Sequence, residues 1–89
     1  MKNIGIIGAG GFAREVLWLI EDLELAGRVG AFFESDEIWS DRRILDIPVL
    51  PLSQFNPGAT ELVIGIGNPV ARRDIVAALP RETTFPVFR

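Results

Sequence analysis

The stretch IGIIGAGGFAREV, residues 4–16, decides how this chain folds. It opens on a short apolar run, continues through three glycines within four residues, and ends in residues typical of a helix. A short, fully apolar run is typical of a strand that is buried on both faces of a parallel sheet. The stretch therefore predicts a strand over residues 4–7, a tight glycine turn, and a helix that begins directly after the turn.

Composition limits what the chain can do. Its 89 residues fit one domain, 1–89, and its net charge of −3 argues against nucleic-acid binding. It has no cysteine and no histidine, which removes disulfides, thiolate zinc sites, and Ser–His or Cys–His nucleophile pairs. We expect neither a catalytic residue nor a metal site. No apolar stretch approaches the roughly 18–20 residues of a membrane span, so we expect a cytoplasmic protein without membrane contact.

The rest of the chain alternates strand-like and helix-like segments. Helical spacing follows the first glycines as far as Gly27, and a second helix is predicted between Asn68 and Pro80. Further strands are predicted over residues 29–33, 47–50, 62–66 and 83–88, with a surface loop over 34–43 and one helical turn near 51–58. This βαβ-β-βαβ order predicts an α/β fold, a small Rossmann-like parallel sheet flanked by helices.

The first glycine turn has the spacing of a phosphate-binding motif. Gly8, Gly10 and Ala13 fit the pattern G-x-G-x-x-G/A, placed after a strand and before a helix. The first glycine allows the tight turn, the second lets an anion approach, and the N–H groups of the helix start face that anion. The alternative is that the glycines only let strand and helix pack closely. Gly11 is a further small residue that packing does not demand, which favours a phosphate.

Two acids follow the second predicted strand. An acid at this place hydrogen-bonds the ribose in NAD-binding folds, and Glu34 stands there, with Asp36 two positions later. Glu34 comes 26 residues after Gly8, later than the usual spacing of about 20. Both acids have the alternative interpretation of solvated loop residues.

A second strand-to-helix turn, GIGNPVARR, has a similar composition. The first and fourth strands of a doubly wound sheet flank the point where ligands bind. We therefore expect Gly65, Gly67 and Asn68 to face Gly10 and Gly11 across one crevice. For Asn68, the role of a plain helix cap stays open.

Four blocks of the sequence together resemble a known family. IGIIGAGGFAREV, VGAFFESDE, IPVL and LVIGIGNPVARR are similar, in this order, to the N-terminal domain of bacterial sugar acyltransferases. That family includes the sialic acid O-acetyltransferases and the UDP-4-amino-sugar N-acetyltransferases, which act in surface polysaccharide or glycan biosynthesis. The resemblance implies a Rossmann-like domain that binds a UDP-sugar or a related nucleotide sugar.

The resemblance also implies which residues bind and what is missing. The acetyl-CoA site, the catalytic histidine and the homotrimer contacts of that family belong to a following left-handed β-helix, which is absent from this chain. We therefore expect no cofactor in this domain and no activity from the chain alone. This sequence has Phe12–Ala13 where the family often has His or Phe followed by Gly. The residues that match the family's site are Gly8, Gly10, Gly11, Phe12, Ala13, Glu34, Asp36, Gly67 and Asn68.

Two other functions remain as alternatives. A domain that binds NAD is supported by Glu34 as a ribose acid, although 89 residues hold only one mononucleotide-binding half. A module for oligomerisation without any ligand is supported by the 48% hydrophobic content and by Trp18, which lies off the apolar stripe of its helix.

Overall fold

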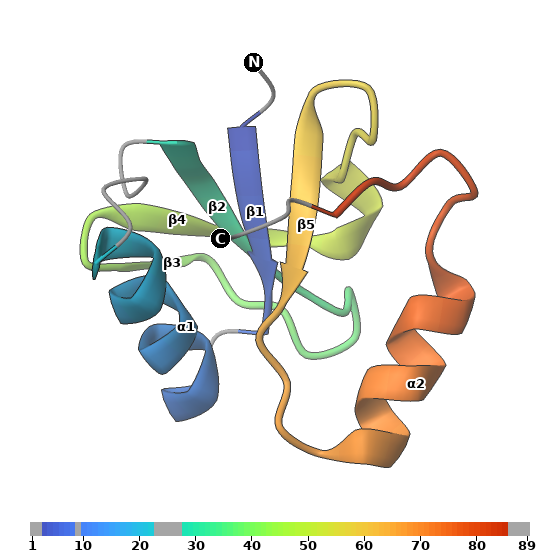
Figure 1. The fold of residues 1–89 in the computed structure, drawn as a ribbon, viewed down its shortest axis with the longest axis horizontal. Helices are drawn as coiled ribbons and strands as arrows, with labels where there is room; N and C mark the ends of the chain where they lie inside the picture. The colour runs from blue at the N-terminus through green and yellow to red at the C-terminus, as the bar shows by residue number, and fades with distance from the viewer. Residues whose placement is uncertain (1–2, 9, 23–27, 86–89) are drawn as a thin grey trace.

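The computed structural model describes residues 3–8, 10–22 and 28–85, and Figure 1 shows their arrangement. The predicted strands over 4–7, 29–33, 47–50 and 62–66 and the second helix are confirmed to within a few residues. The first helix is confirmed as far as Asp22, and its predicted end at Gly27 lies outside the described residues. The helical turn predicted near residues 51–58 is the short 3₁₀ helix η2. In chain order the elements are β1 (Asn3–Ile7), α1 (Gly11–Asp22), β2 (Val29–Glu34), β3 (Arg42–Ile44), β4 (Ile47–Pro51), η2 (Leu52–Gln54), β5 (Thr60–Ile64) and α2 (Pro69–Ala78).

The strands form one sheet in the order β3-β4-β2-β1-β5. β1 pairs in parallel with both β2 and β5, and β2 pairs in parallel with β4. The chain thus builds outward from β1 on one side and then crosses to the other side for β5. This confirms the α/β fold, and it places the reversal of strand order between β1 and β5, the first and fourth parallel strands.

Each face of the sheet carries its own apolar cluster. On one face, α1 buries Ala13, Leu17 and Ile20 against alternate strand residues such as Ile6 and Phe32. On the other face, α2 and η2 cover the remaining strand residues, with Ile75 of α2 and Leu79 directly after it only partly buried. Figure 1 shows the two helices on either side of the sheet, and both begin at the edge where the parallel strands end.

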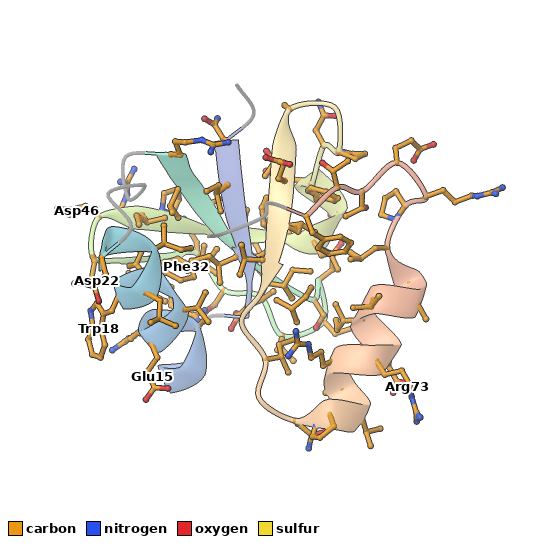
Figure 2. The ribbon with its side chains drawn as sticks, viewed as in Figure 1. Glu15, Trp18, Asp22, Phe32, Asp46 and Arg73 are labelled. Carbon is orange, nitrogen blue, oxygen red and sulfur yellow. The ribbon has the colours of Figure 1, made fainter. Side chains whose placement is uncertain are left out.

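The two tryptophans have different surroundings. Trp18 is 56% exposed on the outer side of α1, beside Glu15 (Figure 2). Trp39 packs partly buried against the core, and its indole Nε1 donates a hydrogen bond to the carbonyl of Val49 at 2.7 Å. No helix in the described parts of the chain has the length and apolar content needed to cross a membrane.

The surface loop predicted over residues 34–43 is wrong at its end, where β3 begins. β3 pairs antiparallel with β4, and Leu45 and Asp46 form the two-residue turn between them. Both turn residues have positive φ, 50° and 67°, as the favoured two-residue hairpin turns require. Such turns usually contain Asn or Gly, so this sequence carries no hairpin signal. Ile44, buried to 5% exposure, holds the strand in place through tertiary packing.

The last predicted strand, over residues 83–88, is not seen where the structure describes it. Residues 83–85 are not in a strand, and residues 86–89 lie outside the described part of the chain. The segment still runs beside β5, because the Leu62 N–H donates to the carbonyl of Thr84 at 3.0 Å.

The hairpin turn gives a stability prediction. Replacing Leu45 by Asn and Asp46 by Gly should raise the free energy of unfolding by about 1 kcal/mol, because both new residues adopt positive φ at lower steric cost. Urea unfolding of the double variant measures this. Asp41→Gly is the matched control: Asp41 is an exposed residue near the hairpin without positive φ, so glycine there should destabilise. Equal effects from both variants would show that the turn is not strained.

Candidate functional site

An open cavity of about 380 Å³ lies at the carboxyl edge of the sheet. It is bounded by the ends of β1, β2 and β5, by the turn before α1 and by residues of α2. This is the place at which ligands bind in open α/β sheets. The residues that line the cavity are Ile7, Gly8, Gly10, Phe33, Glu34, Ser35, Ile38, Gly65, Ile66, Ala71 and Ile75.

Two of the cavity glycines are required by the fold itself. Gly8 has φ of +99°, and a Cβ there would lie 2.8 Å from the carbonyl oxygen of Gly65. A Cβ on Gly65 would lie 2.8 Å from the carbonyl oxygen of Ile7 and 3.0 Å from Cα of Ala13. Real Cβ atoms do not approach neighbours this closely, so any side chain at either position displaces backbone. Gly8 and Gly65 therefore serve the close packing of strand ends against each other and against α1.

Gly10 and Gly11 have a different environment. A Cβ built on either residue has no atom within 4 Å, and both residues are exposed. Packing gives no reason for glycine at these two positions. They stand at the start of α1, where the first N–H groups have no partner inside the helix and carry partial positive charge. Gly10 lines the cavity and so leaves the approach to these N–H groups open from that side, whereas Gly11 is not among the lining residues.

Ala13 and Phe12 complete the predicted first-turn set. The side chain of Ala13 is fully buried in the cluster beneath α1, so it faces away from the cavity. The backbone of Phe12 belongs to the first turn of α1, among the N–H groups that the helix leaves without partners.

Glu34 is the last residue of β2 and lines the cavity. Its carboxylate is held by Arg42, with Oε1 2.9 Å from Nη2 and Oε2 3.1 Å from Nη1. The carboxylate is mostly buried, with a side-chain exposure of 12% against 38% for Arg42. Hydrogen bonding to Glu34 raises the pKa of Arg42, so this cation stays charged at every physiological pH. The alternative of a solvated loop acid does not describe Glu34, which is fixed in one orientation.

Asp36 lies beyond the cavity, near η2. Its carboxylate accepts a hydrogen bond from the backbone N–H of Ser53 at 3.0 Å. Hydrogen bonds from Ser53, first from its side chain and then from its backbone, lower the pKa of Asp36. Asp36 lines a second hollow, between η2 and the end of α2, and Ser35 lines both hollows.

The second turn contributes less to the cavity than the sequence suggests. Gly65 lines it, but Gly67 and Asn68 stand outside the lining, on the exposed connection to α2. The side-chain oxygen of Asn68 accepts hydrogen bonds from the N–H groups of Val70 at 2.9 Å and Ala71 at 3.1 Å. Asn68 is therefore the N-cap of α2, and Pro69 follows at the first helical position.

Sequence reasoning missed the apolar wall of the cavity and the partner of Glu34. The wall is formed by residues such as Phe33, Ile66 and Ile75, whose apolar character indicates only burial. The one signal available was position, because Ser35 directly follows the end of β2 and Ile66 lies two residues after the end of β5. No pattern in the sequence indicated Arg42 as the partner of Glu34, because it lay in a stretch expected to be a loop.

Comparisons with known proteins show a family and a similar fold. The family model described as the PglD N-terminal domain matches residues 3–79. A similar solved structure is the acetyltransferase domain of PglB from Neisseria gonorrhoeae FA1090 in complex with acetyl coenzyme A, with a TM-score of 0.64 and 25% sequence identity. The match covers 85% of this chain and 37% of that chain, so this chain spans well under half of its solved relative. The search of curated proteins gave no match.

The division of the glycines predicts stability losses of different size from the same substitution. Gly65→Ala should lower the free energy of unfolding by about 2–3 kcal/mol, because its Cβ meets backbone on two sides. Gly10→Ala, the matched control in the first turn, should cost less than about 1 kcal/mol, since its Cβ enters open space. Urea unfolding measures both, and similar losses would contradict the division.

The cap of α2 predicts the behaviour of Asn68 variants. Asn68→Ala should cost about 1 kcal/mol of stability through the loss of both side-chain hydrogen bonds, whereas Asn68→Asp keeps an acceptor and should cost little. Thermal or urea unfolding gives the stability, and ligand affinity is measured on the same samples. An affinity loss larger than the stability loss would place Asn68 in the binding site.

Proposed function

This chain belongs to the PglD N-terminal domain family, and from this premise we propose that it is the nucleotide-sugar-binding domain of an acetyl-CoA-dependent sugar acetyltransferase. The proposed ligand is a UDP-sugar, with its diphosphate at the start of α1. One observation carries the proposal: Gly10 and Gly11 leave open space beside the N-terminus of α1, at the rim of a cavity that packing does not fill.

The chemistry of the cavity suits a diphosphate flanked by less polar groups. No lysine or arginine is among its lining residues, so backbone N–H groups at the helix start are the donors for an anion. One helix terminus contributes only about 0.3–1 kcal/mol to a nearby charge, so several N–H groups must act together. Arg73 points away from the sheet (Figure 2) and does not supply the missing charge.

The size and walls of the cavity support a nucleotide-sized ligand. Ligand sites are typically about 300–1,000 Å³, mostly apolar, with a few placed polar groups. This cavity has about 380 Å³ and apolar walls from Phe33, Ile66 and Ile75, and Glu34 is among the residues that line it. We assign the carboxylate to the ribose hydroxyls, as an acid at the end of the second strand in related folds.

In this proposal the domain binds and positions the sugar but performs no chemical step. The chain has no histidine or cysteine that could act as general base or nucleophile. Fixing a nucleotide sugar so that its amine or hydroxyl faces an acyl donor lowers the entropic part of the barrier. The solved relative is an acetyltransferase domain bound to acetyl coenzyme A, which supports this division of labour.

A competition between ligands tests the proposal. Ligand-observed NMR with UDP, a UDP-amino sugar, CMP and NAD in one sample should show saturation transfer to the uridine ligands. Gly10→Val should abolish this transfer while the chain stays folded, because the valine occupies the space that the phosphate needs.

Gly30→Val is the matched control for this experiment. Gly30 lies on β2 next to Asn3, where a Cβ has ordinary contacts of 3.7 Å or more, and it does not line the cavity. This variant should bind as the unmodified chain does. Transfer to NAD alone would replace the nucleotide sugar by a dinucleotide, and equal binding by the Gly10→Val variant would remove the first turn from the site.

A further inference from the structure

The ion pair between Glu34 and Arg42 joins two strands that are not neighbours in the sheet. Glu34 is the last residue of β2, and Arg42 is the first residue of β3, two strands away in the sheet. In the register, Arg42 pairs with Val49, and Val49 pairs with Phe32, two residues before Glu34. The guanidinium therefore reaches past β4 toward the carboxyl edge to meet the carboxylate. A contact across a whole strand requires a long, extended side chain.

Arg42 is itself held in place. Its Nη1 donates to the hydroxyl of Ser40 at 3.1 Å as well as to Oε2 of Glu34. The planar guanidinium and the planar carboxylate meet through two parallel hydrogen bonds, the geometry that arginine forms and lysine does not. Exposed ion pairs usually stabilise a fold little, but a bidentate pair with one mostly buried partner fixes orientation.

The pair leaves Glu34 able to accept further hydrogen bonds. Each carboxylate oxygen has two acceptor positions, and Arg42 uses one on each oxygen. One acceptor position therefore remains on each oxygen of Glu34, a residue that lines the cavity. The cation also balances the carboxylate, and this matters because a bare carboxylate in this cavity would repel a bound diphosphate.

From this geometry we propose that Arg42 is a positioning residue of the nucleotide site. It holds Glu34 as an oriented, charge-balanced acceptor for the ribose hydroxyls of a nucleoside diphosphate. The inference rests on the function proposed above and adds to it a residue and two separable effects. One effect is orientation, which governs the selection of ribose over deoxyribose, and the other is charge balance, which governs overall affinity.

The two effects separate in a series of variants titrated calorimetrically with UDP and with its 2′-deoxy and 3′-deoxy analogues. The unmodified chain should bind UDP about tenfold or more tightly than at least one analogue, as expected for a hydrogen bond to a charged acceptor. Arg42→Met should weaken the binding of all three ligands. It should also lower the preference for UDP about fivefold, because binding must then order a free carboxylate.

Two further variants make the result specific. Arg42→Lys restores a positive charge without the planar fork, so overall affinity should return toward the original while the preference for ribose stays low. Arg43→Met removes the same charge from the next residue of β3, whose Nη1 donates to the carbonyl of Asp46 at 2.8 Å in the hairpin turn. It should change neither the affinity nor the preference.

The outcomes distinguish this inference from the function on which it rests. If UDP binds and Arg42→Met keeps the full preference for ribose, the positioning role is wrong and the nucleotide site stands. If Arg42→Lys behaves in every respect as the unmodified chain, orientation by the fork is wrong. If the unmodified chain binds none of the three ligands, both the inference and the proposed function are overturned.

Discussion

The backbones of β1 and β5 approach each other at their carboxyl ends so closely that no side chain fits between them. The Gly65 N–H donates to the carbonyl of Ile7 at 2.8 Å, and a Cβ on either Gly8 or Gly65 would meet backbone at 2.8 Å. This contact lies where the order of the strands reverses, so it sets the floor of the cavity. The positions of both helix starts, and with them the direction of the N–H groups of α1, depend on it.

The glycines of the first turn therefore divide into two kinds, although the motif treats them alike. Gly8 is explained by its positive φ and by its contact with Gly65, and Ala13 by its burial beneath α1. Gly10 and Gly11 remain unexplained by packing, and a ligand gives them a physical reason. Close packing thus accounts for Gly8 and Ala13, whereas Gly10 and Gly11 are the positions at which we propose the phosphate. The match to the PglD N-terminal domain confirms the family resemblance that four sequence blocks indicate.

The two acids after the second strand show how residues of similar sequence context acquire different surroundings in the fold. An acid after a strand is common, and the sequence indicated both Glu34 and Asp36 as binding residues. The structure gives them different surroundings: Glu34 is bound by Arg42 at the cavity, and Asp36 is bound by Ser53 near η2. Only Glu34 lines the space beside the first turn. Ser35 between them lines both hollows, so a ligand long enough to reach from one to the other would pass this residue.

The sequence by itself determined the α/β fold, four of the strands and both helices, because their apolar periodicities and glycine boundaries are local properties. It also located the first turn and the cap at Asn68, whose chemistry is carried by adjacent residues. Only the tertiary structure decided which glycines pack and which stay open, since that depends on atoms of β5 beside β1. It likewise placed β3, and through it the pairing of Arg42 with Glu34. Arg42 and Glu34 are eight residues apart in the chain and two strands apart in the sheet, and no periodicity records a contact that the folding of a hairpin creates.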